Sequence, residues 1–505
     1  MQCECDDRIT VWGRHKLLVL RAFRNGTKLV LTTRLTADDL APMLDNLAGA
    51  NREFAERYPG INLDRIPIHT FYGGAHLFKK ETPAKLGGLA LRHLQTYAPD
   101  FTAFSRALAL PGAAGLPKAP EEIDALAGSF ADTDGPAVNH PEAWIACAVY
   151  ERVLEKLGRE AIEDQRLDFE DGYGARADEE EDGHAILAAK ELAAGVQAGC
   201  LPPFIGIRIK ALTEEAKARS LRTLDLFLST YAEQGVALPS PFYVTLPKVT
   251  SRAQVEALVS VIEMLEQRCG FPVGSISVEL MIETIQSIVN PSGEIGIPAL
   301  INAGQGRVTS AILGTFDYTA SCNIASHYQD HKHLSADFAR QMMQVCLTGT
   351  NVNICDGITN IMPIPPNKGE ALSPEEVEEN HRVVHAAWRE HFNNILHSLR
   401  LGFYQSWDLN PAQLPLRYAA FYYFFLEGLE DARSRLRTFI DQAAQASMVG
   451  NTFDDAASAQ GLLNFFVNGI NCGALKEEEA LATGITLEEL HGRSFQQIVI
   501  NRMNS

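Results

Sequence analysis

The sequence predicts an α/β fold, a TIM (β/α)8 barrel with an N-terminal helical extension and a C-terminal helical region. Eight short apolar runs read as nearly continuous buried strands, which is typical of a parallel sheet. They begin near residues 67, 166, 204, 242, 276, 308, 353 and 402. Helix-like segments separate these runs, and most starts are roughly 30 to 50 residues apart, the length of a strand–helix unit. Eight such units are the number that closes a barrel.

The first helix is expected within an N-terminal extension that covers residues 1–60. Thr36 is its predicted N-cap, because Asp39 follows three residues later and apolar residues then recur at helical spacing. Further helices are expected between the strands, at 180–198, 213–233, 251–268 and 373–398.

The barrel domain is predicted to cover residues 61–420. Its first connection contains an insertion near 99–140 that is rich in Pro, Gly and Ala, which favours an inserted loop that could contain a short helix. Residues 421–505 are predicted to form a helical region that acts as a lid over the barrel mouth.

Composition limits the classes of partner. The net charge is −19 and no block of basic residues stands out, which argues against nucleic acid and against anionic membrane surfaces. No apolar run is long enough to span a bilayer. Nine cysteines in 505 residues are too few for a disulfide scaffold, and the N-terminal residues do not resemble a signal peptide. We therefore expect a cytoplasmic protein with reduced thiols.

Polar residues stand where the predicted strands end, and the chemistry of such barrels lies at the carboxyl ends of their strands. In chain order these residues are Tyr72-Gly73-Gly74, Glu170-Asp171, Arg208, Lys248, Glu283, Asp317, Asp356 and Asp408. Glu283 and Asp317 end consecutive strands, about 4.8 Å apart in a sheet, so both carboxylates could reach one cation. Two hard oxygen ligands with room for water and substrate suit Mg²⁺. For each acid alone, a helix cap or an ion pair is the alternative.

Two cations are predicted at the same mouth. The guanidinium of Arg208 could hold a substrate carboxylate with two hydrogen bonds, or it could pair with Glu170 or Asp171, which would orient it. Lys248 has three interpretations, namely a Schiff-base nucleophile, a simple cation, or an ion pair that fixes a carboxylate.

The loop after the first predicted strand offers a possible anion site. Gly73-Gly74 could expose backbone N–H groups to an anion, and Lys79 and Lys80 could add positive charge for a phosphate. This keeps open a phosphotransferase. The sequence contains neither a Walker A motif nor GxGxxG, which speaks against it.

Together these segments resemble the HpcH/HpaI aldolase and citrate lyase β-subunit family and, more distantly, malate synthases, all in the phosphoenolpyruvate/pyruvate-binding TIM-barrel superfamily. "LDFEDGYG", "IRIK", "LPKV" and "MIET" look like the family's Leu-Glu-Asp, Arg-Val-Asn, Pro-Lys-Val and Ile-Glu-Thr segments. "GTFDY" is similar to both Gly-x-x-Asp and Arg-Trp-Asp-Tyr. "WDLNPAQ" is similar to His-Pro-x-Gln, with Asn410 in place of the histidine. The resemblance covers roughly residues 66–465.

The resemblance implies roles for the strand-end residues. Glu283 and Asp317 would be ligands of a Mg²⁺ cofactor, and Arg208 would clamp the substrate carboxylate. Glu170 and Asp171 would support these groups. It also implies a homo-oligomer, because barrels of this superfamily are commonly oligomeric.

A further match lies in the helical tail. "TFDDAASAQGLL" resembles the malate synthase segment Met-Glu-Asp-x-Ala-Thr, whose Asp is the general base. This implies the same role for Asp455. The alternative is an acid that stabilises a helix N-terminus.

The expected function is that of an enzyme, a Mg²⁺-dependent carbon–carbon lyase or aldolase. Its substrate would be a pyruvate-, oxaloacetate- or glyoxylate-like 2-oxo acid, or an acyl-CoA, reacting through a metal-stabilised enolate. One alternative, which the superfamily resemblance implies, is a phosphotransferase that acts on phosphoenolpyruvate or pyruvate in the same pocket. The other is a ligand-binding barrel without activity. The chain is longer than typical citrate lyase β-subunits and carries the insertion, so the acyl-CoA specificity of the short lyases stays open.

Overall fold

The computed structural model describes residues 9–11, 18–20, 35–60, 65–130, 140–441, 447–449, 452–454, 456–491 and 498. The chain divides into two units, residues 1–57 and residues 58–505. Within the described residues, no helix is long and apolar enough to cross a membrane.

The first unit contains a short antiparallel pair, β1 (Ile9–Val11) and β2 (Leu18–Leu20), and one helix, α1 (Ala37–Arg57). The predicted N-cap is confirmed. The Thr36 N–H donates to Asp39 Oδ2 at 2.8 Å, and the Asp39 N–H donates to Thr36 Oγ1 at 3.3 Å. No residue of α1 is buried.

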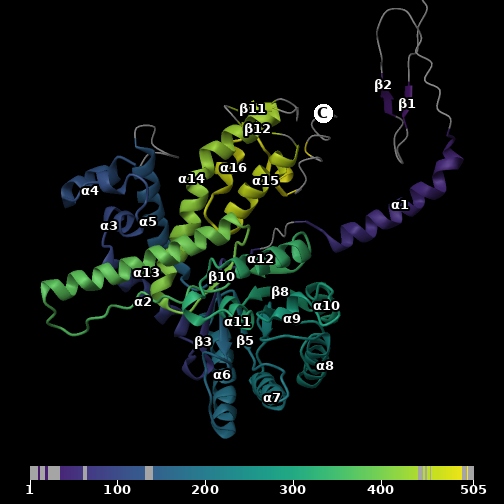
Figure 1. The fold of residues 1–505 in the computed structure, drawn as a ribbon, viewed down its shortest axis with the longest axis horizontal. Helices are drawn as coiled ribbons and strands as arrows, with labels where there is room; N and C mark the ends of the chain where they lie inside the picture. The colour runs from purple at the N-terminus through teal and green to yellow at the C-terminus, as the bar shows by residue number, and fades with distance from the viewer. Residues whose placement is uncertain are drawn as a thin grey trace, which may run out of the picture. The chain divides into compact units, whose positions relative to one another are not determined.

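The second unit is built on a barrel of eight parallel strands, as predicted (Figure 1). The strands are β3 (His69–Gly74), β4 (Asp164–Asp168), β5 (Phe204–Arg208), β6 (Phe242–Leu246), β7 (Ile276–Ile282), β8 (Val308–Leu313), β9 (Asn353–Cys355) and β10 (Ser406–Asp408). Each pairs with its neighbour in chain order, and β10 pairs with β3. A parallel bridge between Asp356 and Ser406 joins β9 to β10, so the sheet closes.

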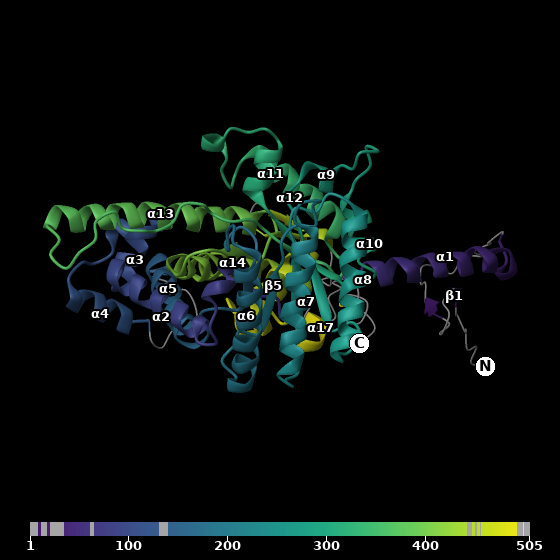
Figure 2. The ribbon, with the colours of Figure 1, turned by 90° about the horizontal axis from the view of Figure 1, so that it is seen from below.

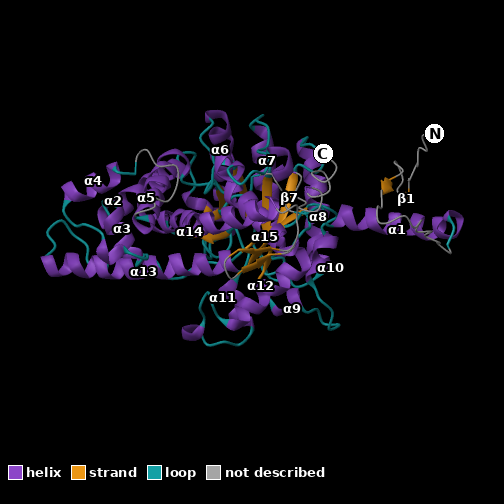
Figure 3. Cartoon of the chain, turned by 90° about the horizontal axis from the view of Figure 1, so that it is seen from above, coloured by secondary structure: helices purple, strands orange, loops and turns teal. Residues whose placement is uncertain are grey.

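Helices cover the outside of this sheet (Figure 3). They include α6 (Asp178–Ala198), α7 (Lys217–Glu233), α8 (Arg252–Cys269), α10 (Ile297–Ala303), α12 (Leu334–Leu347) and α13 (Pro374–Arg400). Outward-facing apolar residues of the strands pack against these helices in one core, for example Ile207, Val244 and Leu280. Two short helices, α9 (Ile285–Ile288) and α11 (Thr315–Ser321), directly follow β7 and β8, and Figure 2 shows them at the same end of the barrel.

The first connection is more helical than predicted. It contains α2 (Thr82–Tyr97), α3 (Phe101–Leu108), α4 (Pro120–Gly128) and α5 (Pro141–Glu160). A second core joins α2, α3 and α5 to α13 and α14 (Leu414–Asp441), with aromatic contacts around the fully buried Trp388. The insertion therefore forms structure because its apolar residues, such as Phe101 and Phe104, find a partner surface on α13.

The C-terminal region continues with α15 (Ala456–Asn471), α16 (Glu477–Leu481) and α17 (Leu487–His491), and with a short pair, β11 (Ser447–Val449) and β12 (Thr452–Asp454). Asn468 of α15 hydrogen-bonds Tyr404, which precedes β10, so this part of α15 lies where that strand begins. The predicted base Asp455 lies outside the described residues, and its role stays a prediction.

Candidate active site

Side-chain alternation along two strands places charged residues inside the barrel. Asp164, Arg166 and Asp168 of β4 face the interior, as do Glu279 and Met281 of β7 and Glu283, which follows it. Each series starts deep in the barrel and ends at its mouth. The interior therefore carries one charged layer near the strand starts and another at the strand ends.

The deep layer is a nearly balanced network centred on Arg166. Its guanidinium donates to Asp164, to Thr245 at 3.2 Å and to Glu279 at 3.3 Å. Thr245 and Ser310 each donate to Glu279 at 2.8 Å. Although burial disfavours its charge, these donors lower the pKa of Glu279, whereas burial raises the pKa of Asp164 to about 6. Both acids therefore share one arginine.

An apolar layer separates this network from the mouth. It consists of Tyr72, Met281, Ile312, Cys355 and Trp407, which form a cluster inside the barrel. The Tyr72 ring meets Trp407 edge-on, with centroids 4.7 Å apart, and its hydroxyl donates to Glu279 of the deep layer at 3.1 Å. The mouth thus has an aromatic floor, and the hydrogen bond from Tyr72 to Glu279 holds that floor in place.

Arg208 lies on this floor and is almost completely buried. Two of its nitrogens donate to the carboxylate of Asp168, with Nε at 2.6 Å, and Nη1 lies 3.4 Å from Glu170. Its guanidinium carbon lies 4.9 Å from the centre of the Tyr72 ring and 5.8 Å from that of Trp407. Asp168 is thus the main partner that orients this arginine, and the ion pair predicted with Glu170 is also present.

Lys248 connects the acids at the rim. Its ammonium donates to Glu170 and to Asp171, the latter at 3.1 Å, and lies 3.9 Å from Asp317. Burial disfavours the charge on Lys248, but the hydrogen bond to Glu170 and the nearby carboxylates raise its pKa. The backbone at Lys248 is left-handed, with φ of 51°, and its N–H donates to Glu283 at 2.6 Å. Such strain is typical of functional sites.

Glu283 and Asp317 lie together at the mouth, and their carboxyl groups hydrogen-bond each other. Burial raises the pKa of Glu283 to about 8, and repulsion from Asp317 adds to this effect. Burial also raises the pKa of Asp317, with a further contribution from Asp171. Two neighbouring carboxyl groups with raised pKa values form a site whose ionised state needs additional positive charge.

Two glycines leave room for carboxylates at the mouth, Gly314 for Glu283 and Gly172 for Asp168. A side chain at Gly314 would place its Cβ 2.2 Å from Glu283 Oε2, and one at Gly172 would place its Cβ 2.5 Å from Asp168 Oδ2. The segments "LGTFD" and "EDGYG" therefore need glycine for close approach of a carboxylate.

The donor set fits Mg²⁺, because Glu283 and Asp317 offer hard oxygen atoms and this ion keeps several waters or substrate oxygens. Within the described residues, no group of three or more His, Cys, Asp and Glu side chains is arranged to hold a metal alone. A metal at this mouth would therefore be shared with water and substrate.

A cavity of about 270 Å³ opens at this end of the barrel. It is lined by Tyr72, Asp168, Asp171, Gly172, Arg208, Gly314, Phe316, Asp317, Ile358, Trp407 and Leu409. Of the predicted site residues, Tyr72, Arg208, Asp171 and Asp317 line it. Lys248, Glu170 and Glu283 do not line the cavity themselves, but each contacts a residue that does.

Comparison with known proteins identifies the family. The family described as "Domain of unknown function (DUF6986)" matches residues 47–498. The chain belongs to this family. A search of curated proteins finds no match.

Solved structures share the barrel at low similarity with this DUF6986 chain. A citrate lyase from Burkholderia xenovorans LB400 has 16% identity and a TM-score of 0.47, with 66% of this chain and 92% of that chain covered. Haloferax volcanii malate synthase, native at 3 mM glyoxylate, has 13% identity and a TM-score of 0.37. Its magnesium/glyoxylate complex has 12% identity and a TM-score of 0.37. For both malate synthase structures, 66% of this chain and 88% of that chain are covered. At these values the likeness assigns no activity to the DUF6986 chain.

Other predicted residues lie elsewhere. Gly73 and Gly74 are not among the residues that line the cavity. Lys79 is 3.3 Å from Glu191, and Lys80 is 3.8 Å from Glu81. Lys79 and Lys80 thus have acidic neighbours in the described structure, and a phosphate-binding role for this loop stays a prediction.

The remaining strand-end acids are members of buried ion pairs. Asp356 accepts two hydrogen bonds from Arg340, at 2.7 and 2.9 Å, and Asp408 accepts two from Arg417, at 2.8 and 3.1 Å. Burial disfavours the charge on both acids, yet the paired arginines bring both pKa values below the usual range. These acids hold the barrel to α12 and α14.

The sequence places the carboxylates of "DFEDG" at the mouth, but the role of Asp168 and the apolar wall were not predicted. Asp168 is the first carboxylate of "DFED" and, with period-two alternation from Arg166, could have been placed on the interior face. The wall residues Phe316, Ile358, Trp407 and Leu409 come from three different strand ends. No local pattern joins them, because only barrel closure brings β8, β9 and β10 together.

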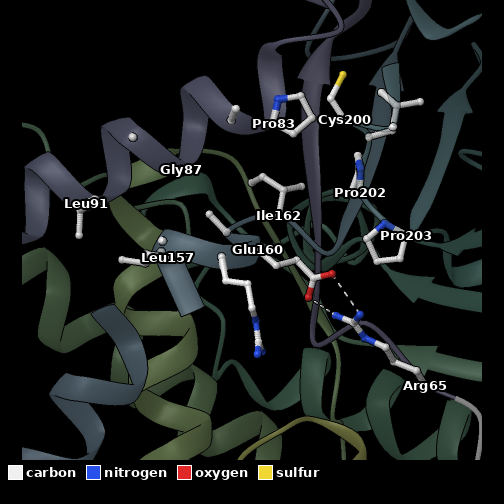
Figure 4. A pocket seen from close by; sticks show the side chains of 17 residues that line it. Arg65, Pro83, Gly87, Leu91, Leu157, Glu160, Ile162, Cys200, Pro202 and Pro203 are labelled. Atoms are coloured by element: carbon white, nitrogen blue, oxygen red, sulfur yellow. Dashed lines mark hydrogen bonds and ion pairs between the residues drawn. The ribbon is translucent and has the colours of Figure 1, made fainter. Parts of the chain in front are cut away.

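A larger cavity of about 690 Å³ lies outside the barrel mouth (Figure 4). Arg65, Ile162 and Pro203, which line it, precede β3, β4 and β5, so it lies where strands begin. Arg65 and Glu160 pair beside it, with one hydrogen bond of 3.1 Å. Since chemistry in these barrels lies at the strand ends, the smaller cavity is the candidate active site.

Proposed function

We propose that this protein is a Mg²⁺-dependent lyase that makes or breaks a carbon–carbon bond next to the keto group of a 2-oxo acid. One observation carries the proposal. Two carboxyl groups with raised pKa values, the buried Glu283 and the half-exposed Asp317, meet at the carboxyl ends of adjacent strands, beside Arg208 and Lys248. The motif resemblance to aldolases and citrate lyase β-subunits supports the same chemistry.

Each group has a defined task in this proposal. Bound Mg²⁺ would act as a Lewis acid that stabilises negative charge on the substrate's keto oxygen. Glu283 and Asp317 would hold the ion. Arg208, fixed by Asp168, presents positive charge from the floor, and electrostatic preorganisation of this kind lowers the barrier to an enolate. Lys248 keeps Glu170 and Asp171 in place.

The contacts of Lys248 argue against a Schiff-base mechanism. A nucleophilic lysine must lose its proton, and the neighbouring carboxylates raise its pKa instead. Borohydride treatment with pyruvate should therefore leave no adduct at Lys248.

The proposal is tested with Glu283→Gln and Asp317→Asn. Each should lower Mg²⁺-dependent cleavage of 2-oxo acid aldols by at least about 10³-fold, since each removes charge that stabilises the transition state through the ion. Glu214→Gln is a matched control, because this exposed acid pairs only with Lys217 in the described structure. Full activity of both site variants, or of the wild type in EDTA, would overturn the proposal.

A further inference from the structure

The helix α1 exposes large apolar side chains to solvent. It is one continuous helix of 21 residues, none of which is buried (Figure 1). The side chains of Met43, Leu44, Leu47 and Phe54 are each more than half exposed. An isolated helix of this length is only marginally stable in water, and the internal Pro42 weakens it further. Such a helix is stabilised mainly by a surface that covers its apolar side.

The spacing of the apolar residues indicates what kind of surface fits. Leu40, Leu47 and Phe54 are seven residues apart, and Met43 and Ala50 each lie three residues after the first two. This alternation of three and four residues is the repeat of a coiled coil, in which the a and d positions of two helices pack together. We call these five residues the α1 seam. A second helix that runs alongside is therefore the surface that the α1 seam fits.

The charges of α1 are placed so that two identical helices can meet. Asp38, Asp45 and Arg52 follow each other at seven-residue spacing and occupy the f positions, which lie farthest from the seam. In a parallel pair, Asn46 of one copy lies beside Asn51 of the other, and their amides can exchange hydrogen bonds. No acid beside the seam faces another acid in this arrangement, so like charges do not oppose the pairing.

We propose that α1 pairs in parallel with α1 of a second copy of this chain, as a two-stranded coiled coil that joins two chains into a dimer. The large apolar side chains of each helix are Leu40, Met43, Leu44, Leu47 and Phe54. Together the two sets would remove roughly 1,000 Å² from water, the size that a specific interface needs. The motifs that resemble the aldolase family begin near residue 66, after this helix. The proposal does not depend on the proposed lyase function.

The first test changes the charge at the centre of the α1 seam. Wild-type protein at micromolar concentration should sediment with twice the mass of the chain in analytical ultracentrifugation. Leu47→Glu should weaken dimerisation by at least about 100-fold, because two carboxylates would meet between the helices. Ala41→Glu is the matched control, since it adds the same charge at an exposed position outside the seam and should leave the dimer intact. Because both substitutions lie on a helix without buried residues, the barrel should fold in each variant.

The second test examines the direction of pairing. In a parallel pair the two copies of residue 40 lie side by side, within reach of a disulfide. Leu40→Cys treated with oxidised glutathione should therefore give a covalent dimer on a non-reducing gel. Ala41→Cys should not, and the wild type shows the background from the nine native cysteines.

Each contrary outcome overturns a stated part of the proposal. A monomeric wild type would mean that another surface covers the α1 seam, either of the same chain or of a different protein. A dimer that Leu47→Glu leaves intact would place the dimer contact outside α1. A dimer that depends on Leu47 but yields no disulfide with Leu40→Cys would contradict the parallel direction.

Discussion

The two charged layers inside the barrel use the same residue types and differ in how completely the charges are matched. In the deep layer, Arg166 serves two acids, and Thr245 and Ser310 complete the hydrogen bonds of Glu279. At the mouth, five acids meet two cations. The acids are Asp168, Glu170, Asp171, Glu283 and Asp317, and the cations are Arg208 and Lys248.

This difference separates structure from chemistry. A buried acid whose oxygen atoms are all bonded holds strands together and has nothing left to offer a ligand. An excess of carboxyl groups with raised pKa values destabilises the folded state until a cation or a proton binds. Such an excess therefore indicates a binding or catalytic site. The mismatch, not the mere presence of acids, marks the mouth as the functional layer.

The largest expected effect on stability comes from breaking the matched layer. Arg166→Met leaves Asp164 and Glu279 buried without their cation and should lower the free energy of unfolding by about 3–5 kcal/mol. Above pH 8, where Glu283 is ionised, Glu283→Gln should instead raise it by about 0.5–2 kcal/mol in metal-free protein, because the buried charge and its repulsion from Asp317 are removed. Urea unfolding measures both changes.

A milder variant keeps this comparison decidable if Arg166→Met does not fold. Ser310→Ala removes one donor to Glu279 and should cost about 1–3 kcal/mol. Equal effects of Ser310→Ala and Glu283→Gln would contradict the division into a structural and a functional layer.

We expect the general base of the proposed reaction to come from outside the barrel mouth. In the proposed function Glu283 and Asp317 hold the metal, while Asp168 pairs with Arg208, and Glu170 and Asp171 pair with Lys248. Asp455→Asn should therefore lower kcat by about 10²-fold, the usual scale for a positioned base, and leave Mg²⁺ binding unchanged. Asp454→Asn is the neighbouring control. Wild-type turnover of the Asp455 variant would return this acid to a role at the start of α15.

Periodicity and strand-end logic predicted the barrel well because both are local. The eight strand starts differ from the predicted ones by no more than four residues, and α6 and α8 begin within two residues of their predicted starts. Contacts between side chains on different strands were harder to predict from the sequence. "DFEDG" shows three acids but not that Asp168 faces Arg208, since this depends on the parallel register between β4 and β5.

The same limit explains the insertion. Its Pro and Gly content favours a loop, yet α3 forms because Asp100 caps it and Phe104 packs beside Trp388. Tertiary packing overrides composition there, and no neighbouring residue in the sequence reveals the partner helix α13.

A smaller effect is expected in the pH dependence of the unfolding temperature, which also distinguishes the mouth from the deep layer. Burial first, and then Asp317, raise the pKa of Glu283 from its usual 4.5 to about 8. The folded state thus binds a proton more tightly than the unfolded state, and this contribution to stability is lost as the pH rises between these values. In EDTA the unfolding temperature should fall toward pH 8 more steeply for wild type than for Glu283→Gln. Mg²⁺ should reduce this difference, and identical curves in EDTA would contradict the assigned pKa.

The smallest effect is expected at cations that belong to neither layer. Lys79 and Lys80 pair with Glu191 and Glu81, with exposed fractions of 57% and 41% for the two lysine side chains. Exposed pairs of this kind contribute about 0–1 kcal/mol. Lys79→Ala and Lys80→Ala should therefore change kcat/KM less than about twofold and leave phosphoenolpyruvate binding, measured by calorimetry, as in wild type. Phosphoenolpyruvate binding at least about tenfold weaker in either variant would place a phosphate site at these lysines. It would then favour phosphotransfer over carbon–carbon cleavage, because these two cations would be holding the phosphate group of the substrate.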